Sequence, residues 1–329
     1  MNQVLFDVCE VSRMIKEGKS LVLAGDEALL KQLPAGTWIG GTIPYFMGDK
    51  GGEFTKQKVY VTVLPADASR QTVRVYDEKT IHDIYCKAPE QGFSIVIMPA
   101  ASKTHEVFSL KAPTFSQFAT RPLIGWISGV DLKDLGKVAP KVVNGKTGEA
   151  LGNAAVVMEA SLPANKAAIV SIANIFEMGS GDSLTFAQDG FSATDVFVNG
   201  EKRNFVDYLL AKKIDTRLPL VADYFGARVN TSFQTVDQAA KRVDFYAPVF
   251  KGVEYKVAQP VANYVESFEK AISARLGDQI AFSCNCILNY LYSGLEGKKT
   301  GNVTGPITFG EVAYQLLNQT MVYMTIENI

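Results

Sequence analysis

Apolar residues near the start of the chain follow first a helical and then a strand pattern. Positions 8, 11, 14 and 15 share one helix face, Asp7 is placed to cap that helix, and Gly18 is placed to end it. The apolar runs 20–24 and 37–43 are typical of buried strands, with a second helix between them that Asp26 caps. Helices and strands are therefore expected to interleave.

The middle of the chain carries signals for paired strands. Asn144-Gly145 is a turn dipeptide, and residues 154–162 and 168–176 flank a short connection that contains Pro163. Both patterns predict antiparallel pairs. A third helix is expected near residues 77–87, and residues 218–225 and 227–233 read as further strands.

The end of the chain combines one clear helix with closing strands. Pro260 precedes an amphipathic helix over residues 261–276, and Gly277 is placed to end it. Strands are expected at 280–284, 306–309 and 320–326. This irregular order predicts an α+β (mixed α/β) fold, with two lobes of mixed, largely antiparallel sheets and flanking helices. We place the lobes at residues 1–195 and 196–329.

Composition and charge narrow the class of protein. The 329 residues are 47% hydrophobic, and 33 Lys+Arg against 34 Asp+Glu give a formal net charge of −1. Because the net charge is close to zero, the protein has no strong positive field to attract nucleic-acid phosphates. We therefore expect no nucleic-acid partner. The N-terminus lacks the pattern of a secretory signal and no apolar run spans a membrane, so we expect a cytoplasmic protein with reduced cysteines.

Several catalytic motifs are missing from the sequence. Gly145-Lys146-Thr147 lacks the first glycine of a phosphate loop, and no G-x-S-x-G, G-x-G-x-x-G or H-E-x-x-H motif occurs. The two histidines, His82 and His105, are expected to lie on the third helix and in a polar loop, in solvated structural roles. We expect no cofactor and no metal.

Cys284-Asn285-Cys286 allows more than one interpretation. One cysteine could act as a nucleophile, with His82 or His105 as its base, which requires a lowered thiol pKa. A zinc site needs more ligands than this pair supplies. The simpler interpretation is that a strand-to-helix junction buries two small thiols.

Glycines interrupt three strand-like segments, in residues 37–43, 122–129 and 219–227. Gly40 and Gly41 with Thr42 are the first example. Glycine within a strand marks either a close approach of the backbone to a ligand or tight packing between sheets. Both explanations stay open from the sequence.

The C-terminal motifs resemble those of the FIST family of bacterial sensory domains. Ser283-Cys284, Gly305, Phe309-Gly310-Glu311 and Asn318-Gln319-Thr320 fall in the order of that family's C-terminal part, and residues 21–42 resemble its N-terminal part. Residues 286–288 depart from the family's Gly-Arg-Gly-like turn, so the resemblance does not imply an anionic ligand.

The resemblance implies a FIST N-like lobe, a FIST C-like lobe and a small-molecule-binding sensory protein. Its ligands include amino acids or related metabolites, and its signal passes to a separate signalling protein. The candidate ligand-binding residues are Gly40, Gly41, Thr42, Cys284, Asn285, Phe309, Gly310, Glu311, Arg228 and Asn230. Glu311, expected at a strand edge, is placed either to meet an ammonium group or to lie in water, and an exposed strand face is expected for Arg228 and Asn230.

Two other classes of function compete with the sensor. A cysteine-dependent enzyme would use Cys284 or Cys286 as described above. A structural or interaction module would recruit another chain through its edge strands. The sensor interpretation is preferred because the chain offers few catalytic groups.

Overall fold

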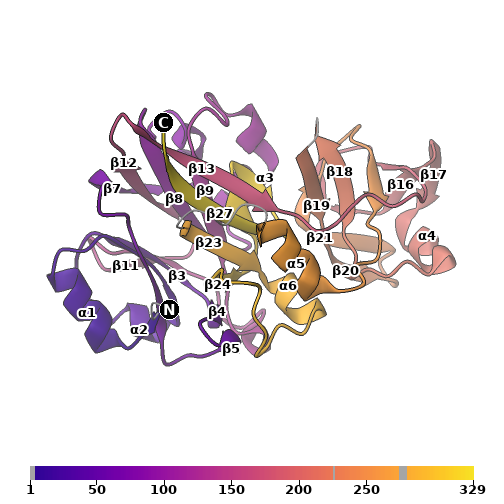
Figure 1. Cartoon of the computed structure of the whole chain (residues 1–329). Helices are drawn as coiled ribbons and strands as arrows, with labels where there is room; N and C mark the ends of the chain where they lie inside the picture. The colour runs from indigo at the N-terminus through magenta and orange to yellow at the C-terminus, as the bar shows by residue number, and fades with distance from the viewer. Residues whose placement is uncertain (1–3, 225–226, 274–279) are drawn as a thin grey trace.

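Mixed sheets dominate the fold. The computed structural model describes residues 4–224, 227–273 and 280–329. Their strands form four six-stranded sheets and one three-stranded sheet, with helices packed around them (Figure 1). The expected mixed α+β class is confirmed.

The first sheet contains the N-terminal strands and has the order β1-β6-β2-β3-β10-β11. Its bounds are β1 (Leu5–Phe6), β2 (Leu21–Gly25), β3 (Trp38–Thr42), β6 (Val59–Val63), β10 (Val142–Asn144) and β11 (Glu149–Leu151). Helices α1 (Val8–Lys16) and α2 (Glu27–Leu30) accompany it. The predicted cap of the first helix is confirmed, because Asp7 and Glu10 form a reciprocal capping box. The Asn144-Gly145 turn joins the antiparallel pair β10–β11, as predicted.

The second sheet lies beside the first and has the order β26-β25-β9-β8-β12-β7. Its bounds are β7 (Ser69–Tyr76), β8 (Gly92–Pro99), β9 (Leu123–Ser128), β12 (Ala155–Ser161), β25 (Glu311–Ala313) and β26 (Gln315–Leu317). Helix α3 (Lys103–Lys111) buries Phe108 in the apolar cluster on one side of this sheet. The central strands β8 and β9 are parallel and buried at every position.

The third sheet combines strands from both ends of the chain, in the order β13-β27-β23-β24-β4-β5. Its bounds are β4 (Tyr45–Gly48), β5 (Gly51–Phe54), β13 (Lys166–Ala173), β23 (Ile280–Cys286), β24 (Gly305–Thr308) and β27 (Met321–Asn328). Helices α5 (Tyr264–Ser273) and α6 (Ile287–Tyr292) lie near its C-terminal strands. The three strands expected at the end of the chain are thus confirmed.

The fourth and fifth sheets gather on the right of Figure 1 with helix α4 (Phe205–Lys212). Their bounds are β14 (Leu184–Thr185), β15 (Gly190–Ala193), β16 (Asp195–Val198), β17 (Glu201–Asn204), β18 (Leu220–Tyr224), β19 (Ala227–Thr231), β20 (Phe233–Asp237), β21 (Arg242–Val249) and β22 (Tyr255–Val257). Phe186, Phe205 and Phe245 pack against one another in their core, with ring centroids 5.6–6.1 Å apart. We call residues 184–257 the β14–β22 region and the remaining described residues the main body.

Strand pairing crosses residue 195. β13 pairs with β27, β4 with β24, and β9 with β25, so C-terminal strands complete sheets that N-terminal strands begin. The β14–β22 region is inserted between β13 and α5. The division into lobes 1–195 and 196–329 stays a prediction, and the strand pairing does not follow it.

Two local predictions are wrong. Residues 154–162 and 168–176 do not form a hairpin, since β12 pairs with β7 and β8 whereas β13 leaves to pair with β27. The helix expected at 77–87 is reduced to a single 3₁₀ turn, Ile81–Asp83. The predicted end of the last long helix, at Gly277, lies outside the described residues.

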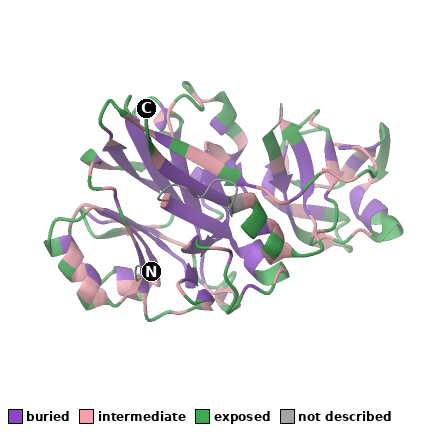
Figure 2. Ribbon diagram, in the orientation of Figure 1, coloured by how far each residue is buried: buried purple, intermediate pink, exposed green. Residues whose placement is uncertain are grey.

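The interiors of the sheets are apolar, and Figure 2 shows their central strands as buried. Trp126 of β9 and Ile97 of β8 meet the backbone of β3 at Gly41, where an added Cβ would lie 2.6 Å from each side chain. A Cβ added at Gly129 would likewise lie 2.3 Å from the ring of Phe309. These two glycines allow close packing. Within the described ranges, no helix is long and apolar enough to span a membrane.

Candidate functional site

A recess opens where β2, β3 and β9 end. Thr42 ends β3 of the parallel pair β2–β3 and Ile43 follows it, and Gly129 and Val130 follow β9. The Gly129 amide donates to the Thr42 carbonyl at 2.8 Å, and the Thr42 hydroxyl donates to the Gly129 carbonyl at 2.8 Å. These bonds fasten the carboxyl ends of two sheets to each other, a place where α/β proteins commonly bind ligands. The space between the lining atoms is about 330 Å³ including its open mouth.

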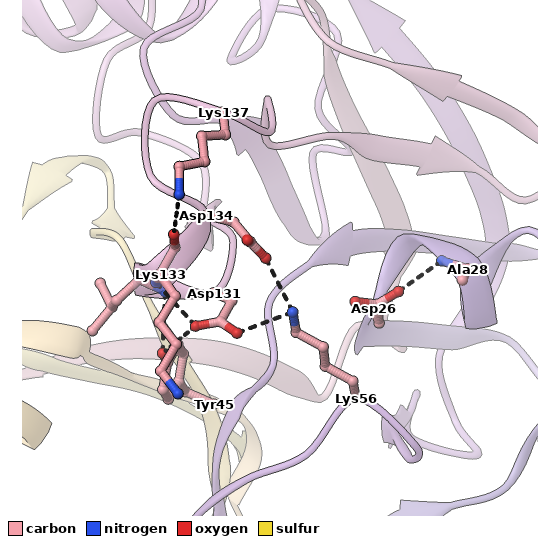
Figure 3. A network of polar contacts seen from close by, with 9 residues as sticks. Asp26, Ala28, Tyr45, Lys56, Asp131, Lys133, Asp134 and Lys137 are labelled. Atoms are coloured by element: carbon pink, nitrogen blue, oxygen red, sulfur yellow. Dashed lines mark hydrogen bonds and ion pairs between the residues drawn. The ribbon is translucent and has the colours of Figure 1, made fainter.

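One wall of the recess is a network centred on Lys56 (Figure 3). The Lys56 ammonium lies 3.0 Å from Asp131 Oδ2 and 3.1 Å from Asp134 Oδ2. The Tyr45 hydroxyl donates to Asp131 Oδ1 at 3.3 Å and accepts the Leu132 amide at 3.2 Å. Three segments of the chain, at Tyr45, Lys56 and residues 131–134, are thereby held together at this wall.

The charges of this network shift one another's pKa values. Hydrogen bonds to Asp131 and Asp134 raise the pKa of Lys56. Burial opposes ionisation of Asp131, but the Lys133 amide and Lys56 together bring its pKa below the usual range. Burial and the neighbouring Asp131 raise the pKa of Tyr45. The wall therefore carries two carboxylates, one ammonium and a neutral phenol near neutral pH.

The lining of the recess includes two further acidic residues, Asp26 and Glu27. Glu27 pairs with Lys141 at 2.8 Å and with Lys31 at 2.5 Å. Asp26 caps α2 by accepting the Ala28 amide at 2.9 Å, and no described cation pairs with it. Figure 3 shows Asp26 joined to Ala28 and not to the Lys56 network, although both line the recess. Asp26 therefore lines the recess without an ion-pair partner among the described residues.

The sequence missed most of this recess. Thr42 is the one candidate residue among those that line it. The sequence marks Asp26 only as a helix cap, and Tyr45, Lys56, Asp131 and Asp134 belong to no motif. The available signal was an acidic residue directly after an apolar strand, as in Gly25-Asp26 and Val130-Asp131. Gly40 and Gly41 are buried, with Trp38 and Leu30 beside Gly40 and Trp126 beside Gly41.

A second group of polar residues is buried on β23, β25 and β27 and their ends. The Thr320 hydroxyl and amide donate to Glu311 Oε2 at 2.8 and 3.2 Å. Asn289 donates to Asn285 Oδ1 at 2.8 Å, and the Cys286 amide donates to the same atom at 2.8 Å. Cys284 is buried on the same strand, and its thiol lies 3.3 Å from the Gly125 carbonyl. The structure thus brings three candidate residues, Cys284, Asn285 and Glu311, to neighbouring strands.

The placement of Glu311 differs from both expectations. It is 0% exposed, whereas a strand edge in contact with water or a ligand was expected. Burial raises its pKa to about 8, against which the hydrogen bonds from Thr320 act. Its Oε1 has no hydrogen-bond partner within the described part of the chain. The reason for the difference is that β25 lies between β9 and β26, so both of its edges are paired.

This buried group continues into the β14–β22 region. Asn318 Oδ1 accepts the Ser232 amide at 3.1 Å and its hydroxyl at 2.7 Å. Asn230 donates to the carbonyls of Asn318 and Gln319 at 3.2 and 3.3 Å, so it is buried rather than on the exposed face expected for it. Arg228 is exposed as predicted and pairs with Glu177 at 3.2 Å. Phe309 is partly buried, and Gly310 is buried against Ile127 and Leu316.

The buried thiols lack the lowered pKa that a nucleophilic cysteine requires. Burial, followed by the charge of Glu311, raises the pKa of Cys284 and Cys286 well above the usual range, the opposite of an activated thiol. All four cysteines are free of disulfides. His105 lies in α3 and is buried beside Phe191, not in a solvated loop, and burial lowers its pKa to about 4. His82 is exposed beside Asp83.

Comparison with known proteins gives one match. The model of a family of unknown function (DUF6976) matches residues 6–327. No curated protein and no solved structure matches the chain. Among the described side chains, no three or more His, Cys, Asp or Glu are grouped to hold a metal ion.

Proposed function

The chain belongs to this family of unknown function, and we propose from its own residues that it binds a small amine or amino acid in the recess. The observation that carries the proposal is the carboxylate of Asp26, which faces a solvent-open recess and has no cation partner among the described residues. An ammonium group there would gain a charge-assisted hydrogen bond.

The rest of the recess suits the remainder of such a ligand. Lys56 offers a positive charge to a carboxylate, although Asp131 and Asp134 already surround it. The hydroxyl of Thr42 and the carbonyl of Gly129 bond each other and hold the backbone that lines the recess. Lys31 and Lys141 pair with Glu27, and Lys56 pairs with Asp131 and Asp134, which leaves Asp26 as the lining carboxylate without an ion-pair partner among the described residues and favours a ligand with a cationic group.

A sensory role follows as the second part of the proposal. The resemblance of the C-terminal motifs to FIST sensory domains supports it, and so does the scarcity of activated catalytic groups. In this proposal the protein is cytoplasmic, consists of two lobes and passes its signal to a separate signalling protein. The buried contacts of Asn318 and Gln319 with Asn230 and Ser232 would connect the main body to the β14–β22 region.

Ligand-induced thermal stabilisation tests the proposal. The protein is heated with a panel of amino acids and small amines, and a ligand at 100 times its Kd is expected to stabilise it by about 2.7 kcal/mol. Asp26→Asn keeps a good helix cap but removes the charge, so it should abolish the shift. Asp7→Asn is the matched control, since Asp7 caps α1 outside the recess. A shift that survives Asp26→Asn, or a flat panel, contradicts the proposed site.

The thiol-enzyme alternative makes a different prediction. An activated Cys284 or Cys286 would be alkylated selectively by iodoacetamide. Their burial and raised pKa values predict instead that the folded protein is labelled at the exposed Cys9 and Cys86. Mass spectrometry of the labelled peptides separates the two.

A further inference from the structure

Strand β13 leaves one edge of the third sheet open. It spans eight residues, and among the described strands it pairs with β27 alone. Figure 2 shows bands of intermediate and exposed residues along it, and Ile169 and Ile172 are 39% and 38% exposed. An open edge of this length is a template for another strand.

The hydrogen-bonding register determines which backbone groups this edge offers. The Ile329 amide donates to the Asn165 carbonyl, so residues 165, 167, 169, 171 and 173 form the hydrogen-bonded pairs with β27. The bond from the Cys286 amide to the Thr320 carbonyl on the other side of β27 gives the same alternation. The N–H and C=O groups of 166, 168, 170 and 172 therefore point away from the sheet.

Three of those four positions are available. The Lys166 amide donates to the Pro163 carbonyl, and the Lys166 carbonyl accepts the Gln91 side chain. No bond to a described residue occupies the outward groups of Ala168, Val170 and Ile172. These residues stand two apart and are symmetric about Val170.

The side chains of this edge lack the usual protection. Edge strands commonly carry charges or proline that prevent pairing. The other eight-residue edge strand among those described, β7, carries Arg70 and Arg74. β13 has the sequence KAAIVSIA, with a single charge at its first residue. Its exposed apolar side chains would lose contact with water on pairing.

We propose that β13 pairs antiparallel with β13 of a second copy of this chain, about a twofold axis at Val170. In this register Val170 faces the partner's Val170 and Ala168 faces the partner's Ile172, which brings all the free outward groups into hydrogen-bonded pairs. Ile169 then lies opposite the partner's Ser171, and no two like charges face each other. The two six-stranded sheets become one continuous sheet.

The oligomeric state tests the proposal. Light scattering after size-exclusion chromatography should give twice the mass of the 35.8 kDa chain. Ile172→Lys places a charge at the pairing edge and should give monomers, as should Val170→Pro, which removes an outward N–H and no hydrogen bond to β27. Val75→Lys is the matched control, because Val75 is exposed on the edge strand β7. Thermal unfolding verifies that each variant is folded.

Crosslinking tests the register itself. In a Cys9→Ser/Cys86→Ser background, Ile169→Cys and Ser171→Cys variants are mixed and oxidised with diamide. A disulfide should join the two variants, whose Cα atoms would be about 4.5 Å apart, far more efficiently than either variant alone. A monomeric protein, a dimer unaffected by Ile172→Lys, or crosslinking without this preference overturns the proposal. A monomer that instead captures an extended peptide at β13 also overturns it, since the edge then serves a different partner.

Discussion

Glu311 shows how far a single residue can depart from its average behaviour. A carboxyl group with no exposure stays neutral near pH 7 if its pKa is about 8, because ionisation would place a charge where water cannot reach it. Thr320 stabilises one oxygen, but Oε1 has no partner among the described residues. Glu311 is therefore a proton-binding group of the folded state.

Replacement of Glu311 with glutamine should make folding stability less dependent on pH. The folded-state pKa of about 8 lies above the ordinary 4.5, so the contribution of Glu311 is fully present below pH 4.5 and is lost as pH rises through 8. Glu311→Gln keeps an acceptor for Thr320 and cannot ionise. In urea unfolding at several pH values, the free energy of unfolding of the variant should rise relative to that of the wild type by several kcal/mol between pH 5 and pH 9.

Glu149→Gln serves as the control, since Glu149 is exposed on β11. It should leave the difference from the wild type constant with pH. A Glu311→Gln variant that tracks the wild type at every pH would show that Glu311 does not bind a proton in this range.

His105 should make folding stability depend on pH in the opposite direction from Glu311. Burial lowers its pKa to about 4 from the ordinary 6.5, so the unfolded chain binds the proton more readily and stability falls as pH drops from 6.5 to 4. The loss amounts to at most about 3 kcal/mol. His105→Phe, which replaces an imidazole whose Nε2 has no partner in the described chain, should abolish this loss in urea titrations. The same change at the exposed His82 should not, and equal pH profiles for both variants would contradict the prediction.

At the scale of elements, local signals predicted the start of the chain better than its strand pairing. Asp7 and Asp26 cap helices as expected, because a cap depends on residues two or three positions away. The connection at Pro163 suggested a hairpin, yet β13 pairs with β27 over 150 residues later. An apolar strand such as 168–173 can pair with any available strand edge, and the residues near it in the sequence do not determine which strand becomes its partner.

Gly41 gives an element-level prediction that separates packing from ligand approach. An added Cβ would lie 2.6 Å from both Trp126 and Ile97, which hold the first and second sheets together. Gly41→Ala should therefore lower the free energy of unfolding by about 1–3 kcal/mol, measured in urea. Gly152→Ala is the control, since no atom lies within 4 Å of its added Cβ. If Gly41→Ala leaves the free energy of unfolding unchanged, the two sheets can move apart at this point with little loss of stability, which contradicts the prediction.

At the scale of the molecule, the polar candidate residues that are buried fall into two places. Thr42 lines the recess, whereas Cys284, Asn285, Glu311 and Asn230 belong to the buried polar group. Sequence order could propose Glu311 and Asn230 as candidates, but only strand pairing shows that both β25 and β19 reach the segment 318–320. The recess was harder to predict, because its residues come from four distant segments joined by ordinary ion pairs.

Asn318 allows a test of how the whole molecule unfolds. It accepts both the amide and the hydroxyl of Ser232, and Ala247 and Phe191 of the β14–β22 region pack against the apolar cluster of the second sheet. These contacts predict a single cooperative transition in the wild type. Asn318→Ala leaves buried donors of Ser232 without that acceptor, at a cost of about 1–3 kcal/mol, and should weaken the coupling of the two parts.

The two tryptophans make this coupling measurable. Trp38 and Trp126 both lie in the main body, so their fluorescence reports that part alone, while far-ultraviolet circular dichroism reports strands of both parts. The two urea curves should coincide for the wild type and for Asn328→Ala, an exposed change on the same chain segment. In Asn318→Ala the dichroism should begin to change at lower urea than the fluorescence. Coincident curves in that variant would place the coupling in the apolar contacts of Ala247 and Phe191, because those are the contacts the substitution leaves intact.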